Sequence, residues 1–191
     1  TPLTPPRNQF FQEISGSKGL EYTHKENQYE DFDIERLLPW KLSTPGPAIA
    51  VGDVNGDQLD DFFIGGAAGE AGALFVQNAN GQFARTAQAT WDADKTYEDA
   101  GIAFLDADGD GDLDLFVASG GNSAAGGQRA YQPRLYTNDG KGNFTRAANA
   151  LPTITDSGSA VATFDYDGDG DLDIFLGGWC MPGSWPLTPT S

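Results

Sequence analysis

Short apolar runs recur along the chain, and acidic loops interrupt them at regular places. Three runs end just before such a loop, and three others begin just after one. The runs are rich in β-branched and aromatic residues, a composition typical of buried strands. In chain order they are residues 48–51, 62–65, 101–104, 115–118, 160–163 and 174–177. The pattern therefore predicts three pairs of strands, each pair joined through an acidic loop.

A second repeated pattern follows the first two loops. Residues 74–83 match residues 135–144, and in each segment an Asn/Gly-rich turn separates two strand-like runs, which is a strong hairpin signal. One full unit is thus strand, acidic loop, strand, connection, strand, turn, strand. Four antiparallel strands per repeat are typical of a β-propeller blade. We therefore predict an all-β fold built from propeller-type blades of four antiparallel strands.

The repeats divide the chain into successive segments. Residues 1–47 are an N-terminal segment with a closing or edge strand near residues 8–14, which resemble the last strand of a unit. Residues 48–99 are blade 1, residues 100–157 are blade 2, and residues 158–191 hold a half blade 3 and a Thr/Pro-rich tail. Because a propeller ring needs at least about four blades, we expect an incomplete ring of about two full blades plus partial blades.

The acidic loops begin at Asp53, Asp106 and Asp165 and carry oxygen-bearing side chains at loop positions 1, 3, 5 and 9. Such spacing lets a short loop wrap a hard cation, because Ca²⁺ prefers about six to eight oxygen ligands. Glycines at positions 4 and 6 allow the backbone to coil inward, and position 7 would offer its backbone carbonyl. We therefore predict three Ca²⁺ sites. The predicted ligands are Asp53, Asn55, Asp57, Leu59 and Asp61; Asp106, Asp108, Asp110, Asp112 and Asp114; and Asp165, Asp167, Asp169, Asp171 and Asp173.

The first loop departs from the other two at two positions. Asn55 keeps an oxygen ligand but removes one charge, and Gln58 replaces the second glycine, so we expect this site to be filled but weaker. Solvated acidic turns are one alternative for the loops, and three aligned copies with the same flanks argue against them. Two others are Mg²⁺, which demands tight octahedral geometry, and an EF-hand, whose longer loop ends in glutamate between helices.

Composition limits the compartment and the partners. The chain of 191 residues has a formal net charge of −17, which argues against nucleic acid as a partner because phosphate contacts need Lys and Arg. Bound cations would offset part of this charge and stabilise the fold. Weak calcium sites fill outside cells, and Cys180, the single cysteine, permits no internal disulfide. We therefore expect a secreted or cell-surface protein that is stapled by calcium and has no transmembrane segment.

The loops and their flanks resemble the FG-GAP/VCBS calcium-binding repeats, which also form the propeller blades of integrin α-subunits. Residues 23–26, 37–39, 63–69 and 138–144 are similar to phrases of secreted bacterial proteins in the ASPIC/UnbV-associated VCBS group. The resemblance covers about residues 9–187. It implies a β-propeller, an extracellular location and a role in adhesion or polysaccharide contact, and it implies no defined reaction. The chain departs from the family pattern by ending within a blade.

The sequence offers no catalytic constellation, and we expect no enzyme activity. His24 is the only histidine, and no Gly-x-Ser-x-Gly motif is present. We predict an extracellular calcium-binding repeat module with a structural or adhesive role. Residues 8–14 of another chain would complete the half blade at residues 160–178 by strand addition, and repetition would give a head-to-tail fibre. The alternative is a fragment of a larger secreted propeller that binds or cleaves polysaccharide.

Carbohydrate is a further candidate partner, through two groups of residues. The connection at residues 119–131 is longer than its counterpart in the first unit and leads to Arg129, Tyr131 and Arg134, which form either a ligand-contacting rim or a surface insertion. Several aromatic side chains could stack on sugar rings, although core packing is their default. These are Trp40, Trp91, Trp179, Trp185, Tyr97 and Tyr131, of which Trp179 and Trp185 are the better candidates for contacts to another chain.

Overall fold

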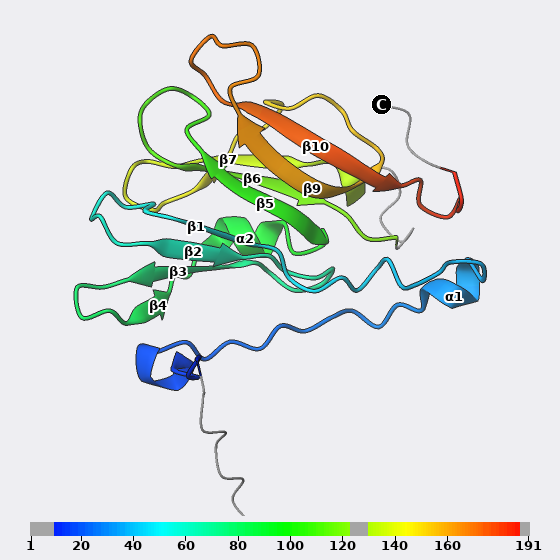
Figure 1. The fold of residues 1–191 in the computed structure, drawn as a ribbon, viewed down its shortest axis with the longest axis horizontal. Coiled ribbons are helices and arrows are strands. Elements are labelled where there is room, and N and C mark those ends of the chain that lie inside the picture. The colour runs from blue at the N-terminus through cyan, green and yellow to red at the C-terminus, as the bar shows by residue number, and fades with distance from the viewer. Residues whose placement is uncertain (1–9, 123–129, 188–191) are drawn as a thin grey trace, which may run out of the picture.

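The predicted strand pairs belong to three stacked antiparallel sheets (Figure 1). The computed structural model describes residues 10–122 and 130–187. Blade 1 has the strand order β1-β2-β3-β4, blade 2 has the order β5-β6-β7-β8, and blade 3 consists of β9 and β10 within the described residues. The strands are β1 Ile49–Gly52, β2 Asp61–Ile64, β3 Ala73–Gln77, β4 Phe83–Arg85, β5 Asp99–Leu105, β6 Asp114–Ser119, β7 Arg134–Thr137, β8 Thr145–Arg146, β9 Ser157–Phe164 and β10 Asp173–Cys180. The fold is therefore all-β, with an incomplete propeller-like array of blades, as predicted.

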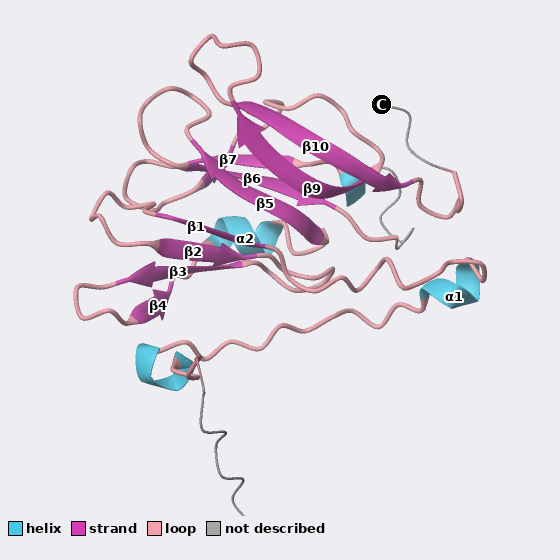
Figure 2. Cartoon of the chain, in the orientation of Figure 1, coloured by secondary structure: helices cyan, strands magenta, loops and turns pink. Residues whose placement is uncertain are grey.

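Helices make up little of the described part of the chain (Figure 2). A 3-10 helix covers Ser15–Lys18, α1 covers Asp31–Ile34 and α2 covers Ala89–Ala93. None of these helices has the length and the hydropathy needed to cross a membrane. Strands and their connections thus carry the architecture.

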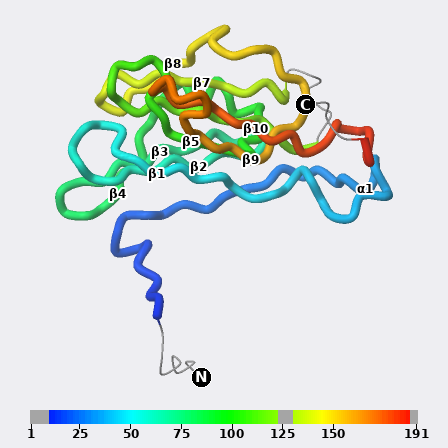
Figure 3. Tube along the Cα trace, turned by 45° about the horizontal axis from the view of Figure 1, so that its top comes forward, coloured from blue at the N-terminus to red at the C-terminus, as the bar shows by residue number. Residues whose placement is uncertain are grey.

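The blades stack through their first strands. β5 lies between β1 and β9 and contacts both of them (Figures 1 and 3). Gly101 permits the close approach of β5 to β9, because a Cβ atom at this position would lie 2.2 Å from the carbonyl oxygen of Ser159. A larger residue at position 101 would push these two strands apart.

β6 is buried on both of its faces, because successive side chains of a strand point to opposite sides of the sheet. Leu115 and Val117 belong to the core between blades 1 and 2, together with Phe63. Phe116 lies on the other face and packs in the core that Ile174 of blade 3 also joins. A blade in this stack therefore needs an apolar neighbour on each side, which explains why its strands are short continuous apolar runs.

The N-terminal segment covers the outer face of blade 1 (Figure 1). Leu20 and Tyr22 pack against the core of that face, and the rings of Tyr22 and Phe75 meet edge to face with centroids 5.9 Å apart. Blades 2 and 3 each pack against the blade before them, and this extended segment covers part of the corresponding face of blade 1.

The edge strand expected near residues 8–14 is not formed over residues 10–14 of this chain. These residues have no regular structure, and Phe10 and Phe11 are 90% and 88% exposed. Residues 8 and 9 lie outside the described part of the chain. The start of this segment, dark blue in Figure 1, lies at the opposite end of the stack from β10, so residues 10–14 do not reach the open edge of blade 3 in their own chain.

Phe116 and Phe175 occupy equivalent positions in blades 2 and 3, yet 2% of the first and 56% of the second is exposed. Replacing Phe116 by Ala empties a site between two blades, so we expect the free energy of unfolding to fall by about 3–5 kcal/mol. The matched Phe175→Ala change should cost less than about 1 kcal/mol in dilute solution. Urea denaturation followed by tryptophan fluorescence measures both losses, and equal losses would contradict an open face on blade 3.

Glu98 supplies a test of stability against pH. Burial, and then the nearby charges of Glu26 and Asp99, raise the pKa of Glu98 to about 7, although the carboxylate accepts the Ala68 N–H at 2.8 Å. Because the folded state binds this proton more tightly than the unfolded state, the contribution of Glu98 is greatest at low pH and is lost as pH rises toward 7. Between about pH 5 and pH 8 in EGTA, we expect this loss to be roughly 2–3 kcal/mol.

The Glu98→Gln variant isolates this effect, because an amide keeps the shape of the side chain without the ionisation. Chemical denaturation at several pH values should show a flatter stability curve for the variant between about pH 5 and pH 8. If the variant and the unaltered chain have the same slope, Glu98 is not the group responsible.

Candidate metal centres

Each acidic loop joins the first strand of a blade to its second strand: β1 to β2, β5 to β6 and β9 to β10 (Figure 1). The antiparallel turn that the loop makes is built from its own carboxylates. The aspartates at positions 1 and 9 accept most of the hydrogen bonds that shape it.

The aspartate at position 9 anchors the loop to the sheet behind it. Asp61 and Asp114 have no exposed surface, and each accepts two backbone N–H groups, one from the residue after position 1 and one from the end of the third strand. Burial raises the pKa of both carboxyl groups above the ordinary value, against the lowering effect of these hydrogen bonds. The distances are 3.1 Å from Val54 and 2.8 Å from Gln77 to Asp61, and 2.9 Å from Ala107 and 2.8 Å from Asn138 to Asp114.

Asp173, the position-9 aspartate of blade 3, makes the first of these two bonds. It accepts the Tyr166 N–H at 2.8 Å, and its side chain is exposed. In the described residues blade 3 has no third strand, which is the element that supplies the second donor in blades 1 and 2. The loop of blade 3 is therefore formed but is tied to two strands only.

The aspartate at position 1 sets the turn of the loop by accepting the N–H groups of positions 4 and 6. Asp53 accepts Gly56 at 2.8 Å and Gln58 at 2.7 Å. Burial acts to raise the pKa of Asp53, but backbone hydrogen bonds lower it below the ordinary value. The corresponding distances are 2.8 Å from Gly109 and 3.0 Å from Gly111 to Asp106, and 2.7 Å from Gly168 and 3.2 Å from Gly170 to Asp165.

The first loop keeps the turn of the other two although it lacks their second glycine. Gln58 adopts a positive φ of 68°, close to the conformation that Gly111 and Gly170 adopt in the other loops. A residue with a Cβ atom pays roughly 1–2 kcal/mol for this left-handed conformation. The substitution therefore adds strain to the first loop and leaves its hydrogen-bonding pattern in place.

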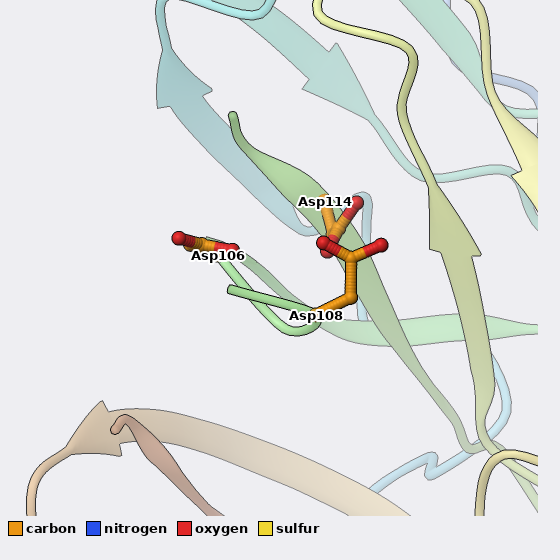
Figure 4. Close-up of side chains that lie close together, drawn as sticks. All are labelled: Asp106, Asp108 and Asp114. Carbon is orange, nitrogen blue, oxygen red and sulfur yellow. The ribbon is translucent and has the colours of Figure 1, made fainter. Parts of the chain in front are cut away.

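The carboxylates at positions 1, 3 and 9 come together in the second and third loops. In each loop these oxygens lie within 4.8 Å of one another, and Figure 4 shows the three side chains of the second loop. The first loop offers an amide oxygen at position 3, where Asn55 replaces the aspartate. The two groups are Asp106, Asp108 and Asp114 in the second loop, and Asp165, Asp167 and Asp173 in the third.

Positions 5 and 7 have a different role in this structure. The carboxylate at position 5 accepts the N–H of position 7, so it supports the turn beside the converging oxygens. Burial, and then the neighbouring carboxylates, raise the pKa of Asp112 at position 7 of the second loop to about 6. The distances are 2.9 Å from Leu59 to Asp57, 3.1 Å from Asp112 to Asp110 and 2.9 Å from Asp171 to Asp169. Ligation by position 5 and by the position-7 carbonyls stays a prediction.

The donor set fits a hard divalent cation. Both converging groups consist of aspartates, and their ligand atoms are all oxygens. Like charges this close disfavour one another's ionised form, and a cation between them removes that repulsion. Oxygen-rich sites of this kind suit Ca²⁺ and Mg²⁺ and do not suit softer metals, which prefer nitrogen or sulfur ligands.

Asn138 joins the first two loops, and the sequence analysis did not identify this role. Its side-chain amide donates to the carbonyl of Val54 at 2.7 Å and to that of Leu113 at 3.1 Å. Its backbone N–H is the one that binds Asp114, so a single residue fixes both loops. The signal was the repeated Asn/Gly hairpin, in which Asn78 is the counterpart of Asn138.

Most aromatic residues considered for sugar contact pack within the chain. Trp91 lies in the core between blades 1 and 2, with its ring centroid 4.9 Å from that of Phe63, and Tyr131 is also buried. Trp179 and Trp185 pack against a small core formed with the N-terminal segment of the same chain. Among the other candidates, Trp40 is 56% exposed.

Of the three residues considered for a ligand-contacting rim after the long connection, the structure describes Tyr131 and Arg134. Arg134 is buried, 4% exposed, and Arg129 lies outside the described residues. Cys180 is buried and carries a free thiol.

The family comparison agrees with this repeat organisation. A model of the FG-GAP-like repeat matches residues 53–117 and again residues 106–176, and each match begins at the first aspartate of an acidic loop. The two matches together cover more than half of the chain. No curated protein matches it. With its acidic loops, its blades and both repeats in register, the chain belongs to the FG-GAP-like repeat family.

Proposed function

We propose that this chain is an extracellular calcium-binding repeat module with a structural or adhesive role. The observation that carries the proposal is the convergence of three aspartates in the second and third loops. A Ca²⁺ ion there would relieve the repulsion among these carboxylates. Because the position-9 aspartate also accepts hydrogen bonds from the sheet, the ion would stabilise the sheet as well as the loop. Metal binding would in this way add to the free energy of folding. Sites of modest affinity fill at extracellular calcium concentrations, which supports a secreted location.

A non-catalytic role is part of the same proposal. His24, the only histidine of the chain, lies 3.0 Å from Glu26 and thus forms a local polar contact. The aspartates of the loops hold the turns through backbone hydrogen bonds. These hydrogen bonds favour a structural role for the acidic residues.

Self-assembly of the module is supported by the open edge of blade 3. β10 pairs with β9 on one side, and no strand of residues 10–122 or 130–187 pairs with its other edge, whose backbone groups could bind a further strand. Residues 8–14 of a second copy are the proposed strand, with Phe10 and Phe11 highly exposed. An added strand would also bring an N–H group toward Asp173, where blades 1 and 2 have their second donor.

The open faces at the two ends of the stack suit a head-to-tail arrangement. Phe164 and Phe175 of blade 3 are 44% and 56% exposed, whereas Phe116, the counterpart of Phe175, is covered by the following blade. At the other end of the stack, Ile49 and Val51 of blade 1 are 56% and 63% exposed. Repeating one contact between these faces would build a fibre.

A larger secreted propeller that binds or cleaves polysaccharide is the second candidate, and the same face of blade 3 favours it. A following blade in a longer chain would cover Phe175 as blade 3 covers Phe116. Intact mass spectrometry of the native protein separates the two candidates. A mass well above the 20.3 kDa of these 191 residues would favour the larger propeller.

Calcium should raise the thermal stability of the chain. At about 100 times its dissociation constant, one bound ion adds about 2.7 kcal/mol, and each kcal/mol raises Tm by about 2–4 °C in a chain of this size. We therefore expect EGTA to lower Tm by several degrees in scanning fluorimetry. Asp108→Asn should reduce this response, and Asp60→Asn should leave it unchanged because Asp60 is exposed and is not a predicted ligand. An EGTA-independent Tm would overturn the calcium proposal.

Association should depend on the open end of blade 3. Light scattering and sedimentation over a range of concentrations should show growth of the mean mass, because an apolar face and a strand edge are both exposed. Phe175→Glu and Phe11→Pro should each suppress this growth, the first by placing a charge on the face and the second by removing a strand N–H. The control is Leu37→Glu, which changes a residue that is 85% exposed elsewhere. A monomer at every concentration would exclude the fibre.

A further inference from the structure

We propose that a cavity at the outer edge of blade 2 binds a uronate-bearing oligosaccharide. The cavity has a volume of about 790 Å³ and lies among the start of β7, the end of β8 and the connection at residues 147–155. Ligand pockets of small molecules occupy about 300–1,000 Å³. The acidic loops lie elsewhere, because β7 starts at this cavity and ends at Thr137, and the next residue, Asn138, contacts the second loop. The inference deepens the adhesive part of the proposed function by naming a ligand class.

The charge of the cavity wall differs from that of the chain. The chain has 28 acidic and 11 basic residues, yet the lining contains Arg134 and Arg146 and no Asp or Glu. Arg134 is buried, so an anion entering the cavity meets the guanidinium group of Arg146, whose side chain is 37% exposed. A ligand with a carboxylate is therefore favoured over a neutral one.

The two guanidinium groups are held in place from behind. Arg134 donates to Asp99 at 2.5 Å, and Arg146 donates to Asp94. Both acidic partners are buried. These partners fix the orientation of the arginines, and each carboxylate offsets the formal charge of one guanidinium, so the attraction for an anion depends on the N–H donors that Arg146 has left.

Tyr97 adds an aromatic support for both arginines. The guanidinium carbon of Arg134 lies 4.3 Å from the centre of the Tyr97 ring, and that of Arg146 lies 5.5 Å from it. The ring is thus occupied by the arginines and is poorly placed to stack on a sugar. Arg146 keeps 37% of its side chain exposed, and a guanidinium with five N–H donors has some left for a ligand carboxylate.

The opposite wall is shaped by Gln132. Its side-chain amide donates to the carbonyl of Pro152 at 2.9 Å and accepts the N–H of Ile154 at 3.0 Å. These two bonds tie the connection to the segment just before β7, so the wall is formed before a ligand binds. A preformed wall lowers the ordering cost of binding.

The remaining lining combines uncharged polar groups with apolar ones. Asn149 and Thr153 are exposed and bring amide and hydroxyl groups, while Leu135, Leu151 and Ile154 bring apolar surface. Sugar hydroxyls match the first kind of group, the C–H faces of a sugar ring match the second, and a uronate carboxylate matches Arg146. An acidic peptide would share the carboxylate chemistry only, and for that reason the saccharide is the ligand we propose.

The test is a calorimetric titration of the whole chain in calcium buffer with trigalacturonic acid. Maltotriose serves as the neutral comparison and triglutamate as the acidic peptide. We expect trigalacturonate to bind with a dissociation constant on the order of 0.1–1 mM, and the two comparison ligands to bind at least tenfold more weakly. Binding of maltotriose as tight as that of trigalacturonate would overturn the role of the arginines. Tighter binding of triglutamate would replace the saccharide by an acidic peptide.

Two substitutions locate the binding in the cavity. Arg146→Gln removes the accessible guanidinium, and Asn149→Asp places a negative charge on an exposed position of the lining, so each should weaken trigalacturonate binding at least tenfold. Asn149→Asp covers the case in which Arg146→Gln destabilises the fold by freeing Asp94. Lys141→Gln is the matched control, because it removes a positive charge from an exposed hairpin of the same blade. Undiminished binding in both cavity variants, or no binding to the unaltered chain, would overturn the proposal.

The calcium proposal and the saccharide proposal can be tested independently of each other. Asp108→Asn alters a predicted calcium ligand and should leave trigalacturonate binding unchanged. Loss of saccharide binding in that variant alone would place the saccharide at the metal loop. A Tm that does not respond to EGTA, together with normal saccharide binding, would overturn the calcium proposal and keep the cavity.

Discussion

The structure depends on a buried aspartate that accepts two backbone N–H groups at once. Asp61 and Asp114 stand at the start of the second strand, and each binds the loop before it and the end of the third strand beside it. A carboxylate with no exposed surface is costly unless both oxygens are satisfied. This cost keeps the loop and the third strand in place, because moving either of them would leave a buried carboxylate without one of its N–H donors.

The same carboxylates explain why a cation would matter to the blade as a whole. Position 9 belongs to the converging group and to the sheet, so a change of charge in the loop acts directly on the bonds between strands. The second loop shows the repulsion between its charges, because burial and neighbouring carboxylates raise the pKa of Asp112 to about 6. A raised carboxyl pKa in the empty loop indicates repulsion among the carboxylates, and a bound divalent ion would reduce that repulsion.

The sequence predicted the repeat unit, the four-stranded blades and the aspartates that converge, because each rests on local spacing. The apolar runs also predicted buried strands, and β6 is buried along its whole length. The bridging role of Asn138 was not predicted, since it joins residues 84 positions apart and requires the stacking of two blades. The placement of Trp91 depended on the same stacking. Residues 10–14 were expected to form a strand from their similarity to other last strands, but a strand needs a partner, and these residues pair with none of the strands in the described part of the chain.

The two ends of blade 2 have separate chemistry that shares the same strands. β5 begins at Asp99, which holds Arg134 at the cavity, and ends just before Asp106 of the acidic loop. Seven extended residues span roughly 20 Å, so an ion at the loop cannot touch a ligand in the cavity. Calcium could therefore influence the cavity only through the strands, by changing how rigidly they are held. A blade of this kind would keep a bound cation and a bound ligand apart, so the cation could stabilise the fold while the lining at the opposite end varies.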